Sequence, residues 1–166
     1  MKENNREEIF SERYRTHKDM VFRIAMTYLK NPADAGDVLQ DVFLKLYTHE
    51  KPFESEEHMK RWLIRVTINL AKNRLTAFWN SHRQDVEIPE SFGMTDMESE
   101  VLSAVLGLPP RYKAVIYLHY MEGYAYQEIA QILHISLSAV KMRAKRGREY
   151  LKADFLGEGK GAYDVE

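Results

Sequence analysis

Hydrophobic residues recur at three- and four-residue spacing along most of the chain, and no stretch keeps the strict alternation of a half-buried strand. This spacing is that of an amphipathic helix, so the pattern predicts an all-α protein. The first stripe ends before Asn31-Pro32, where Asn31 is a favourable N-cap, Pro32 fits a first turn and Asp34 suits the helix dipole. A third helix is predicted to begin near Ser55. The apolar positions of these three helices are Phe10, Tyr14, Val21, Ile24, Ala25 and Tyr28; Val38, Leu39, Val42, Phe43 and Leu46; and Met59, Trp62, Leu63, Val66, Leu70 and Leu75.

The pattern breaks at residues 81–94, which are polar and acidic, contain a proline and a glycine, and show no period. We interpret this stretch as a flexible linker. Thr95 and Glu98 then have the spacing of a capping box that opens a helix ending at Gly107, and Leu-Pro-Pro starts another that ends at Gly123. The predicted organisation is two small helical domains, at residues 5–80 and 95–152, with a disordered tail at 153–166.

Two short helices joined by a tight corner are predicted in the stretch EIAQILHISLSAVKMRAKRGREYL. The first covers residues 126–133, the corner covers 134–136, and the second runs to about Leu151, with Ser136 as its cap. This is helix-turn-helix spacing. The side of the second helix expected to pack carries Leu137, Val140, Ala144, Gly147 and Leu151, and Gly147 permits a close approach to a neighbour.

The opposite side of that second helix is rich in cations. It carries Ser138, Ala139, Lys141, Met142, Arg143, Lys145, Arg146, Arg148 and Glu149. A helix that is apolar behind and cationic in front fits the major groove of DNA, about 12 Å wide, where Arg and Lys reach guanine edges or phosphates. The alternative is that these cations only solvate an amphipathic helix. The preceding helix, the capped corner and the scarcity of acids on this face favour DNA.

Charge is segregated along the chain although the formal net charge is only −1. Residues 58–83 contain six Lys and Arg and no Asp or Glu, and residues 109–152 contain eight cations, Lys113 among them, against three acids. Between them, residues 85–100 contain six acids and no Lys or Arg. Two basic modules on either side of an acidic connector predict two places that contact phosphate.

The composition points away from enzymes and metal sites. The chain has no cysteine, which excludes disulfides, thiolate chemistry and sulfur-ligated zinc. Its six histidines show no i, i+4 pair, no glycine-rich phosphate loop follows a strand, and His119 and His134 are interpreted as core or surface residues. We therefore expect no enzymatic activity, no cofactor and no metal. No apolar run approaches the roughly 20 residues needed to cross a bilayer, and the first residues do not read as a secretion signal, so we expect a cytoplasmic protein.

Motifs in both halves resemble the small bacterial sigma factors of the extracytoplasmic-function type, within the sigma-70 family. LPPRYKAVIYLHYMEGYAYQEIAQILHISLSAVKMRAKRGREYLK resembles sigma region 4, which reads the minus-35 promoter element. NPADAGDVLQDVFLKLY and KRWLIRVTINLAKNRL resemble region 2, which binds core RNA polymerase and opens the minus-10 element. The resemblance implies core RNA polymerase, promoter DNA and an anti-sigma factor as partners.

The resemblance also assigns roles to residues of the first domain. Asp37, Gln40 and Asp41 would contact the clamp helices of the polymerase largest subunit; without the resemblance they would be an ordinary solvated face. Phe53, Glu54 and Ser55 would form a loop that captures a base flipped from the non-template strand. Asn69 would assist from the third helix, where the cations Arg61, Arg65 and Lys72 track the DNA backbone. The sequence leaves Phe53 open between pocket wall and core plug, and it favours packing for Trp62.

The carboxyl half departs from the family pattern at two positions that face DNA. Ala139 and Met142 stand where threonine and serine are frequent, and apolar side chains there favour contacts with thymine methyl groups. In addition, Tyr124-Ala125 replaces the usual serine, which leaves the first helix of the motif with a poorer cap.

Two other functions fit part of the sequence. A regulator could use the same helix-turn-helix to bind an operator as a dimer, with the amino half as an effector domain. A helical interaction protein that never meets DNA is the other alternative. The amino half distinguishes the regulator from a sigma factor, because an effector domain should offer a pocket or dimer seam rather than an acidic helix and a cationic, aromatic helix. Weak salt dependence of any nucleic-acid binding would favour the interaction protein.

Overall fold

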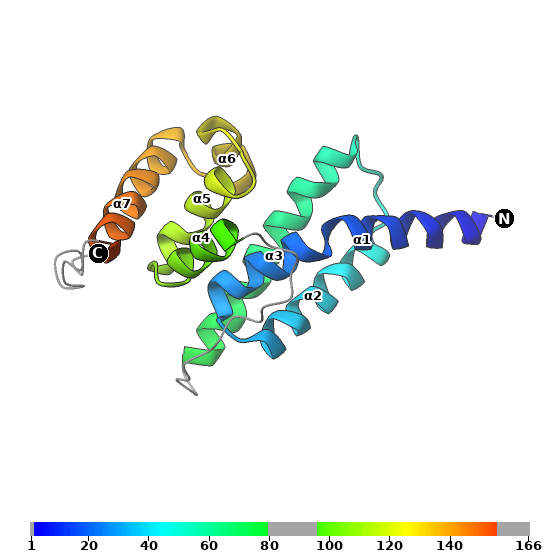
Figure 1. The fold of residues 1–166 in the computed structure, drawn as a ribbon. Coiled ribbons are helices and arrows are strands. Elements are labelled where there is room, and N and C mark those ends of the chain that lie inside the picture. Colours follow the sequence, from blue (N-terminus) through cyan, green and yellow to red (C-terminus); the bar gives the residue numbers. More distant parts are fainter. Residues whose placement is uncertain (1, 80–95, 156–166) are drawn as a thin grey trace. The chain divides into compact units, whose positions relative to one another are not determined.

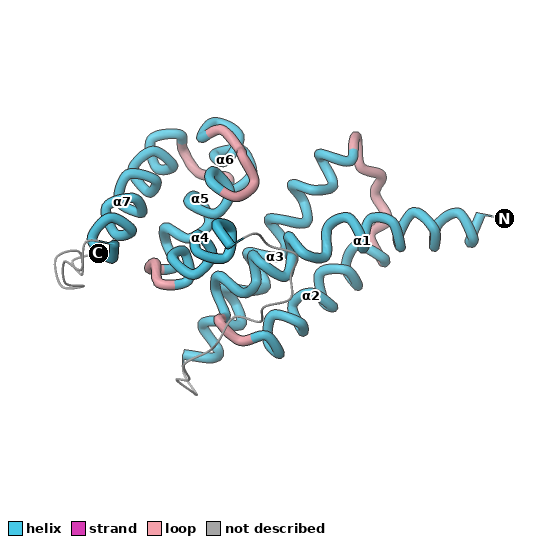
Figure 2. The backbone as a smooth tube through the Cα atoms, in the orientation of Figure 1, coloured by secondary structure: helices cyan, strands magenta, loops and turns pink. Residues whose placement is uncertain are grey.

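A computed structural model describes residues 2–79 and 96–155, and within them the chain is helical, with short turns and no strand (Figures 1 and 2). The helices are α1 (Lys2–Leu29), α2 (Pro32–Tyr47), α3 (Glu56–Trp79), α4 (Asp96–Leu106), α5 (Pro110–Tyr120), α6 (Tyr126–Leu133) and α7 (Leu137–Phe155). This confirms the all-α prediction. The helices form two compact units, α1–α3 and α4–α7. Within the described ranges, no helix has the length and apolar character that a membrane crossing requires.

Helix α1 has an exposed first half and a second half that is buried almost all round. Residues 20–29 are buried except Arg23, because this half packs against both α2 and α3. The first half contacts α2 through its aromatic side chains: the ring centroids of Phe10 and Tyr47 are 5.2 Å apart, and those of Tyr14 and Phe43 are 4.8 Å apart. Tyr14, predicted in the apolar stripe, remains exposed.

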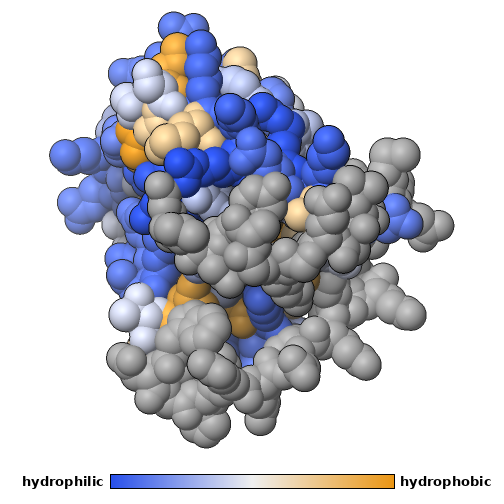
Figure 3. Space-filling model, turned by 90° about the vertical axis from the view of Figure 1, so that its left-hand side faces the viewer, coloured by the Kyte–Doolittle hydropathy of each residue, from blue (hydrophilic) through white to orange (hydrophobic). Residues whose placement is uncertain are grey.

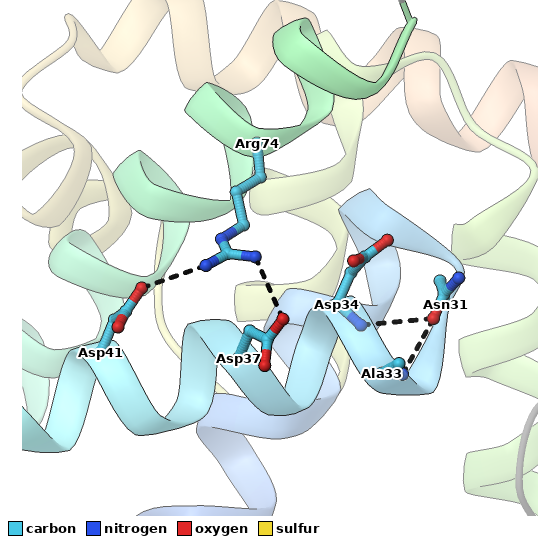
Figure 4. Close-up of polar contacts among 6 residues, drawn as sticks. All are labelled: Asn31, Ala33, Asp34, Asp37, Asp41 and Arg74. Carbon is cyan, nitrogen blue, oxygen red and sulfur yellow. Dashed lines mark hydrogen bonds and ion pairs between the residues drawn. The ribbon is translucent and has the colours of Figure 1, made fainter. Parts of the chain in front are cut away.

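The start of α2 follows the prediction. Lys30 adopts a positive φ of 56° and ends α1. Asn31 then caps α2, and its side-chain oxygen accepts hydrogen bonds from the backbone N–H groups of Ala33 and Asp34 at 2.8 and 3.2 Å (Figure 4). Pro32 occupies the first turn, where its missing N–H has no intrahelical partner to lose. Capping residues in the sequence therefore fixed this helix boundary.

The buried face of α3 is rotated from the predicted stripe. Met59 and Leu63 are fully buried as expected, whereas the predicted Trp62, Val66, Leu70 and Leu75 are only half-buried. Ile64, Thr67, Ile68 and Ala71 are buried instead. The face is wider than a single stripe because α3 packs against α1 and α2 together. Thr67 tolerates burial because its hydroxyl donates to the Leu63 carbonyl at 2.6 Å.

The second unit is organised around α5, which contacts α4, α6 and α7. All residues from Tyr112 to Leu118 are buried. The helix ends at Tyr120, before the predicted Gly123, and Gly123 lies in the following turn with a φ of 76°. Helix α7 runs through Phe155, so residues 153–155, which were predicted to begin the disordered tail, are helical. The predicted linker and Thr95 lie outside the described residues, and the side chain of Glu98 is not among those described. The linker and the capping box therefore stay predictions.

Lys113 is buried in the core of the second unit, although its charge placed it in the basic surface block. Its side chain is 2% exposed, and Nζ donates to the backbone carbonyl of Leu106 at 3.2 Å. Leu106 is the last residue of α4, where carbonyl groups lack intrahelical partners and attract cations. Lys113 thus donates to a carbonyl at the carboxyl end of α4, and its charge is not on the surface.

Candidate nucleic-acid interface

The predicted helix-turn-helix is formed by α6, a three-residue corner and α7. His134 turns the chain with φ 55° and ψ 44°, the left-handed conformation that commonly ends helices. The backbone N–H of Ile135 then bonds to the Ala130 carbonyl at 3.1 Å. Ser136 caps α7, its Oγ accepting from the N–H of Ala139 at 3.1 Å. These contacts confirm the predicted corner, and the uncapped Ala125 confirms the poorer start of α6.

The inner face of α7 packs against the rest of the second unit. Val140, Ala144 and Gly147 are buried, as predicted. A Cβ at Gly147 would lie 2.6 Å from Cγ1 of Ile116, so the glycine does permit a close approach to α5. Leu137, which was predicted on this face, is 37% exposed. It is the first residue of α7, at the corner, where it is only partly covered.

The outer face of α7 presents the predicted DNA contacts to solvent. Ser138, Lys141, Met142, Lys145 and Arg148 are exposed, whereas Ala139, Arg143 and Arg146 are half-buried. Met142, one turn from Ser138, is 46% exposed, so an apolar side chain is held open among cations. On the face shown in Figure 3, most of the described surface is hydrophilic, and hydrophobic residues reach it in separate small patches. The exposed side of α7 therefore combines several cations with the apolar side chain of Met142.

Arg148 also fastens the two helices of the motif to each other. Its Nη1 donates to the Tyr126 hydroxyl at the start of α6, at 2.7 Å. Slight burial lowers the pKa of Arg148, but hydrogen bonds to the hydroxyls of Tyr120 and Tyr126 outweigh it, and the pKa lies above the ordinary arginine value. The guanidinium is thus fully charged and partly committed to the protein.

His119 supports the start of α6. Its Nδ1 atom lies 2.8 Å from the Tyr124 carbonyl oxygen, and its ring centroid is 4.4 Å from that of Tyr126. Among the described residues, no three His, Asp or Glu side chains gather closely enough to bind a metal ion.

In the first unit, the loop between α2 and α3 gathers an aromatic cluster around Phe53. The Phe53 ring stacks on His49 with centroids 4.6 Å apart, and it meets Trp62 and His58 at 5.5 Å each. The guanidinium of Arg13 lies 5.8 Å from its centroid. Phe53 is half-buried, so it forms part of a cluster that remains open to solvent.

Two further loop residues make backbone contacts with the start of α3. Ser55 Oγ accepts from the N–H of His58 at 3.0 Å, and the N–H of Glu54 donates to Nδ1 of His58 at 3.1 Å. The sequence reasoning missed Arg13, His49 and His58. A signal for His58 was present, since it stands three residues after the capping Ser55.

The residues predicted on α3 share one side of the helix. At about 100° per residue, the four positions span an arc of about 80°. They are Arg61, Arg65, Asn69 and Lys72. Asn69 and Lys72 are exposed and the two arginines half-buried, with Arg61 Nε 3.1 Å from Glu57 Oε1. Phe78 and Trp79 are further aromatic residues of the cationic, aromatic helix, and their side chains lie outside the described part.

The acidic side of α2 is joined to α3 by Arg74. Its Nη1 lies 3.4 Å from Asp37 Oδ2, and its Nη2 lies 3.3 Å from Asp41 Oδ2 (Figure 4). All three side chains keep 40% or more of their surface exposed. Leu44 is 62% exposed on the same helix, one turn beyond the exposed Gln40. This surface thus combines amide, carboxylate and apolar groups. Leu44 was predicted neither in the buried stripe of this helix nor in the polymerase contact.

Comparison with known proteins identifies both units. The family described as Sigma-70 region 2 matches residues 13–80, and Sigma-70, region 4 matches residues 98–151. The ECF RNA polymerase sigma-E factor of Haemophilus influenzae is 30% identical over 138 residues, covering 72% of this chain and 73% of that protein. The chain belongs to the extracytoplasmic-function sigma factors. The ECF sigma factor SigW of Bacillus subtilis is 26% identical over 165 residues, which are 88% of each chain.

Solved structures agree with this fold. The sigma factor RpoE of Bartonella quintana, solved with the anti-sigma factor NepR, superposes with a TM-score of 0.70 at 22% identity. The match covers 90% of this chain and 98% of that one. CnrH, solved with the cytosolic domain of CnrY, has a TM-score of 0.62 at 20% identity and covers 92% and 91%.

Membership of this family decides between the functions left open by the sequence. The protein is a sigma factor that directs promoter recognition by RNA polymerase, and it is not an enzyme. The region 2 match covers the unit that a dimeric regulator would use as an effector domain, so that alternative is wrong.

Proposed function

We propose that the two units of this sigma factor divide promoter recognition between them. Residues 5–80 dock on the clamp helices of the polymerase largest subunit and hold the opened minus-10 strand. Residues 95–152 place α7 in the minus-35 major groove. The observation that carries the proposal is the outer face of α7, where Lys141, Met142 and Lys145 are exposed opposite the buried Val140 and Ala144.

On α7, the cations would contact phosphates and guanine edges, while Ala139 and Met142 would meet thymine methyl groups. A bidentate contact of Arg or Lys with guanine discriminates by about 1–3 kcal/mol. The proposed minus-35 residues are Ser138, Ala139, Lys141, Met142, Arg143, Lys145, Arg146 and Arg148.

In the first unit, the open cluster around Phe53 would receive a base extruded from the non-template strand. Extrusion costs a few kcal/mol, so a shaped pocket both stabilises the open state and selects sequence. Glu54, Ser55 and Asn69 would line this site, and Arg61, Arg65 and Lys72 would neutralise the strand that leads to it.

The polymerase contact is proposed at Asp37, Gln40 and Asp41. Arg74 holds both carboxylates at 3.3–3.4 Å, so a basic group of the polymerase would share or replace this internal partner. Exposed ion pairs contribute only about 0–1 kcal/mol, which makes such an exchange inexpensive.

We further propose that the protein works in the cytoplasm and that an anti-sigma factor binds it. Support comes from two proteins of similar fold: the sigma factor RpoE, which was solved with the anti-sigma factor NepR, and CnrH, which was solved with the cytosolic domain of CnrY. Such a partner would occlude the polymerase contact, the DNA contacts or both.

The test mixes purified protein with core RNA polymerase and maps transcription start sites on a genomic template library. Discrete start sites that depend on the protein are expected. Arg146→Ala should retain core association and lose minus-35-dependent initiation, whereas Asp41→Ala should lose core association. Lys152→Ala on α7 and Glu12→Ala on α1 are matched exposed controls and should behave as wild type. Failure of the wild type to bind core enzyme, or failure of both variants at one step, would overturn the proposal.

A further inference from the structure

One histidine of α3 holds the backbone of the loop between α2 and α3. Nδ1 of His58 accepts a hydrogen bond from the N–H of Glu54 at 3.1 Å. In return, Ser55 Oγ accepts from the N–H of His58 at 3.0 Å. The imidazole and the Phe53 ring pack in a T-shaped arrangement, with the ring planes 79° apart. His58 therefore contacts three consecutive loop residues.

This arrangement is a variant of the capping box, in which an N-cap Ser or Thr and a Glu or Gln three residues later exchange hydrogen bonds. His58 takes the place of the Glu or Gln and reaches one residue further back. A backbone N–H can only donate, so Nδ1 must be unprotonated and the ring neutral, with its proton on Nε2. Histidine changes charge between about pH 5 and 8, whereas a glutamine oxygen accepts throughout that range.

Charged and titratable groups of both signs lie in the loop, in the first turns of α3 and beside Phe53. They are Arg13 from α1, His49 and Glu54 from the loop, and Glu56, Glu57 and Arg61 from α3. The two arginines are engaged with carboxylates, Arg13 with Glu56 at 2.9 Å and Arg61 with Glu57 at 3.1 Å. The contact that depends directly on the charge of His58 is therefore its bond to Glu54.

We propose that neutral His58 is a positioning residue for capture of the minus-10 base, and that its protonation releases the loop and weakens promoter opening. The inference rests on the proposed role of the loop. Protonation sets an Nδ1–H against the N–H of Glu54, which removes the bond. It also places a cation at the positive amino end of α3. Opening is expected to fall as the pH falls.

The test measures open-complex formation by the full chain with core RNA polymerase, on promoter fragments recovered from the template library. Permanganate reactivity of unpaired thymines is followed from about pH 8 to about pH 6, the range in which histidines titrate. Wild type is compared with His58→Gln, His58→Ala and His49→Gln. The core enzyme has a pH dependence of its own, which is common to all variants and cancels in their ratios.

Loss of one hydrogen bond predicts that wild-type opening falls about two- to tenfold relative to His58→Gln over this range. His49→Gln, which removes the other imidazole on Phe53 but leaves the Glu54 bond, should fall as wild type does. His58→Ala should open poorly at every pH. Equal pH dependence of wild type and His58→Gln would overturn the proposal.

A second measurement needs no polymerase. In NMR spectra of the full chain, the Glu54 amide proton should move upfield as the His58 ring titrates, and this shift should vanish in His58→Gln. A Glu54 amide chemical shift that does not change over the pH range would also overturn the proposal. Absence of core binding by the wild type, with the NMR coupling intact, would instead count against the sigma assignment of the loop.

Discussion

Two glycines in helix interiors should respond to alanine in opposite directions. Gly36 lies in α2, and a Cβ there would meet no atom within 4 Å. Gly147 lies in α7, and a Cβ there would sit 2.6 Å from Cγ1 and 2.7 Å from Cδ1 of Ile116 in α5. Alanine raises helix propensity equally at both sites, but its methyl group has room at position 36 and collides with Ile116 at position 147.

The magnitudes follow from these surroundings. Alanine is favoured over glycine inside a helix by about 0.5–1 kcal/mol, so Gly36→Ala should stabilise the first unit by about that amount. At Gly147 the gain is opposed by overpacking, which costs about 1–3 kcal/mol. Ile116 is fully buried, so its side chain can yield only by shifting within the core. Gly147→Ala should therefore destabilise the second unit by up to about 2 kcal/mol.

Urea unfolding of the full chain separates the two effects. Both tryptophans, Trp62 and Trp79, belong to α3, so tryptophan fluorescence follows the first unit, whereas far-ultraviolet circular dichroism follows helices of both. Gly36→Ala should raise the fluorescence midpoint. Gly147→Ala should leave the fluorescence midpoint unchanged. It should lower the urea midpoint of the circular dichroism change that belongs to the second unit.

The outcome at Gly147 decides whether the reasoning holds. A Gly147→Ala variant as stable as the wild type would mean that Ile116 yields without cost and that the close approach of α5 and α7 is not required. Equal stabilisation by both substitutions would show that propensity alone governs these sites.

Three further substitutions test contacts described above. Ser136→Ala should destabilise the second unit by about 1 kcal/mol through loss of the α7 cap, while Ser138→Ala should change its unfolding midpoint little; a cost at Ser138 equal to that at Ser136 would contradict the cap. Lys113→Ala should lower the free energy of unfolding of the second unit by about 2–4 kcal/mol, because it leaves a cavity and removes a donor from the Leu106 carbonyl. Lys113→Met should lower it less, and equal urea midpoints for the two variants would refute the prediction. Arg74→Gln should change stability by under about 1 kcal/mol and tighten core binding in fluorescence titrations at low salt, and weaker binding would show that Arg74 supports the contact.

Local signals in the sequence located the helix boundaries well. Asn31 and Ser136 cap the helices that follow them, since capping depends on residues within one turn. The packing side of α7 was largely readable because one small residue, Gly147, marks the close approach. The motifs of both halves led to the correct family.

Contacts between distant residues were not readable in the same way. The buried face of α3 is wider than one stripe because two helices cover it, and no local pattern records the second. Lys113 was assigned to the surface by its charge, whereas its partner is a carbonyl seven residues away. Arg74 belongs to the cation-rich stretch 58–83 and Asp41 to the predicted polymerase contact, and only the packing of α2 against α3 joins them.

On α7, the exposed side chains proposed to read bases and the buried side chains that pack the core are largely different residues, although Arg148 also bonds to Tyr126. Ser138 and Met142 can be exchanged without entering the interior, whereas Val140 and Ala144 have no exposed surface at all. Duplicated copies of such a gene can therefore diverge toward new target sequences by single substitutions that leave the scaffold intact. The separation makes this helix an accessible route for the evolution of new regulons.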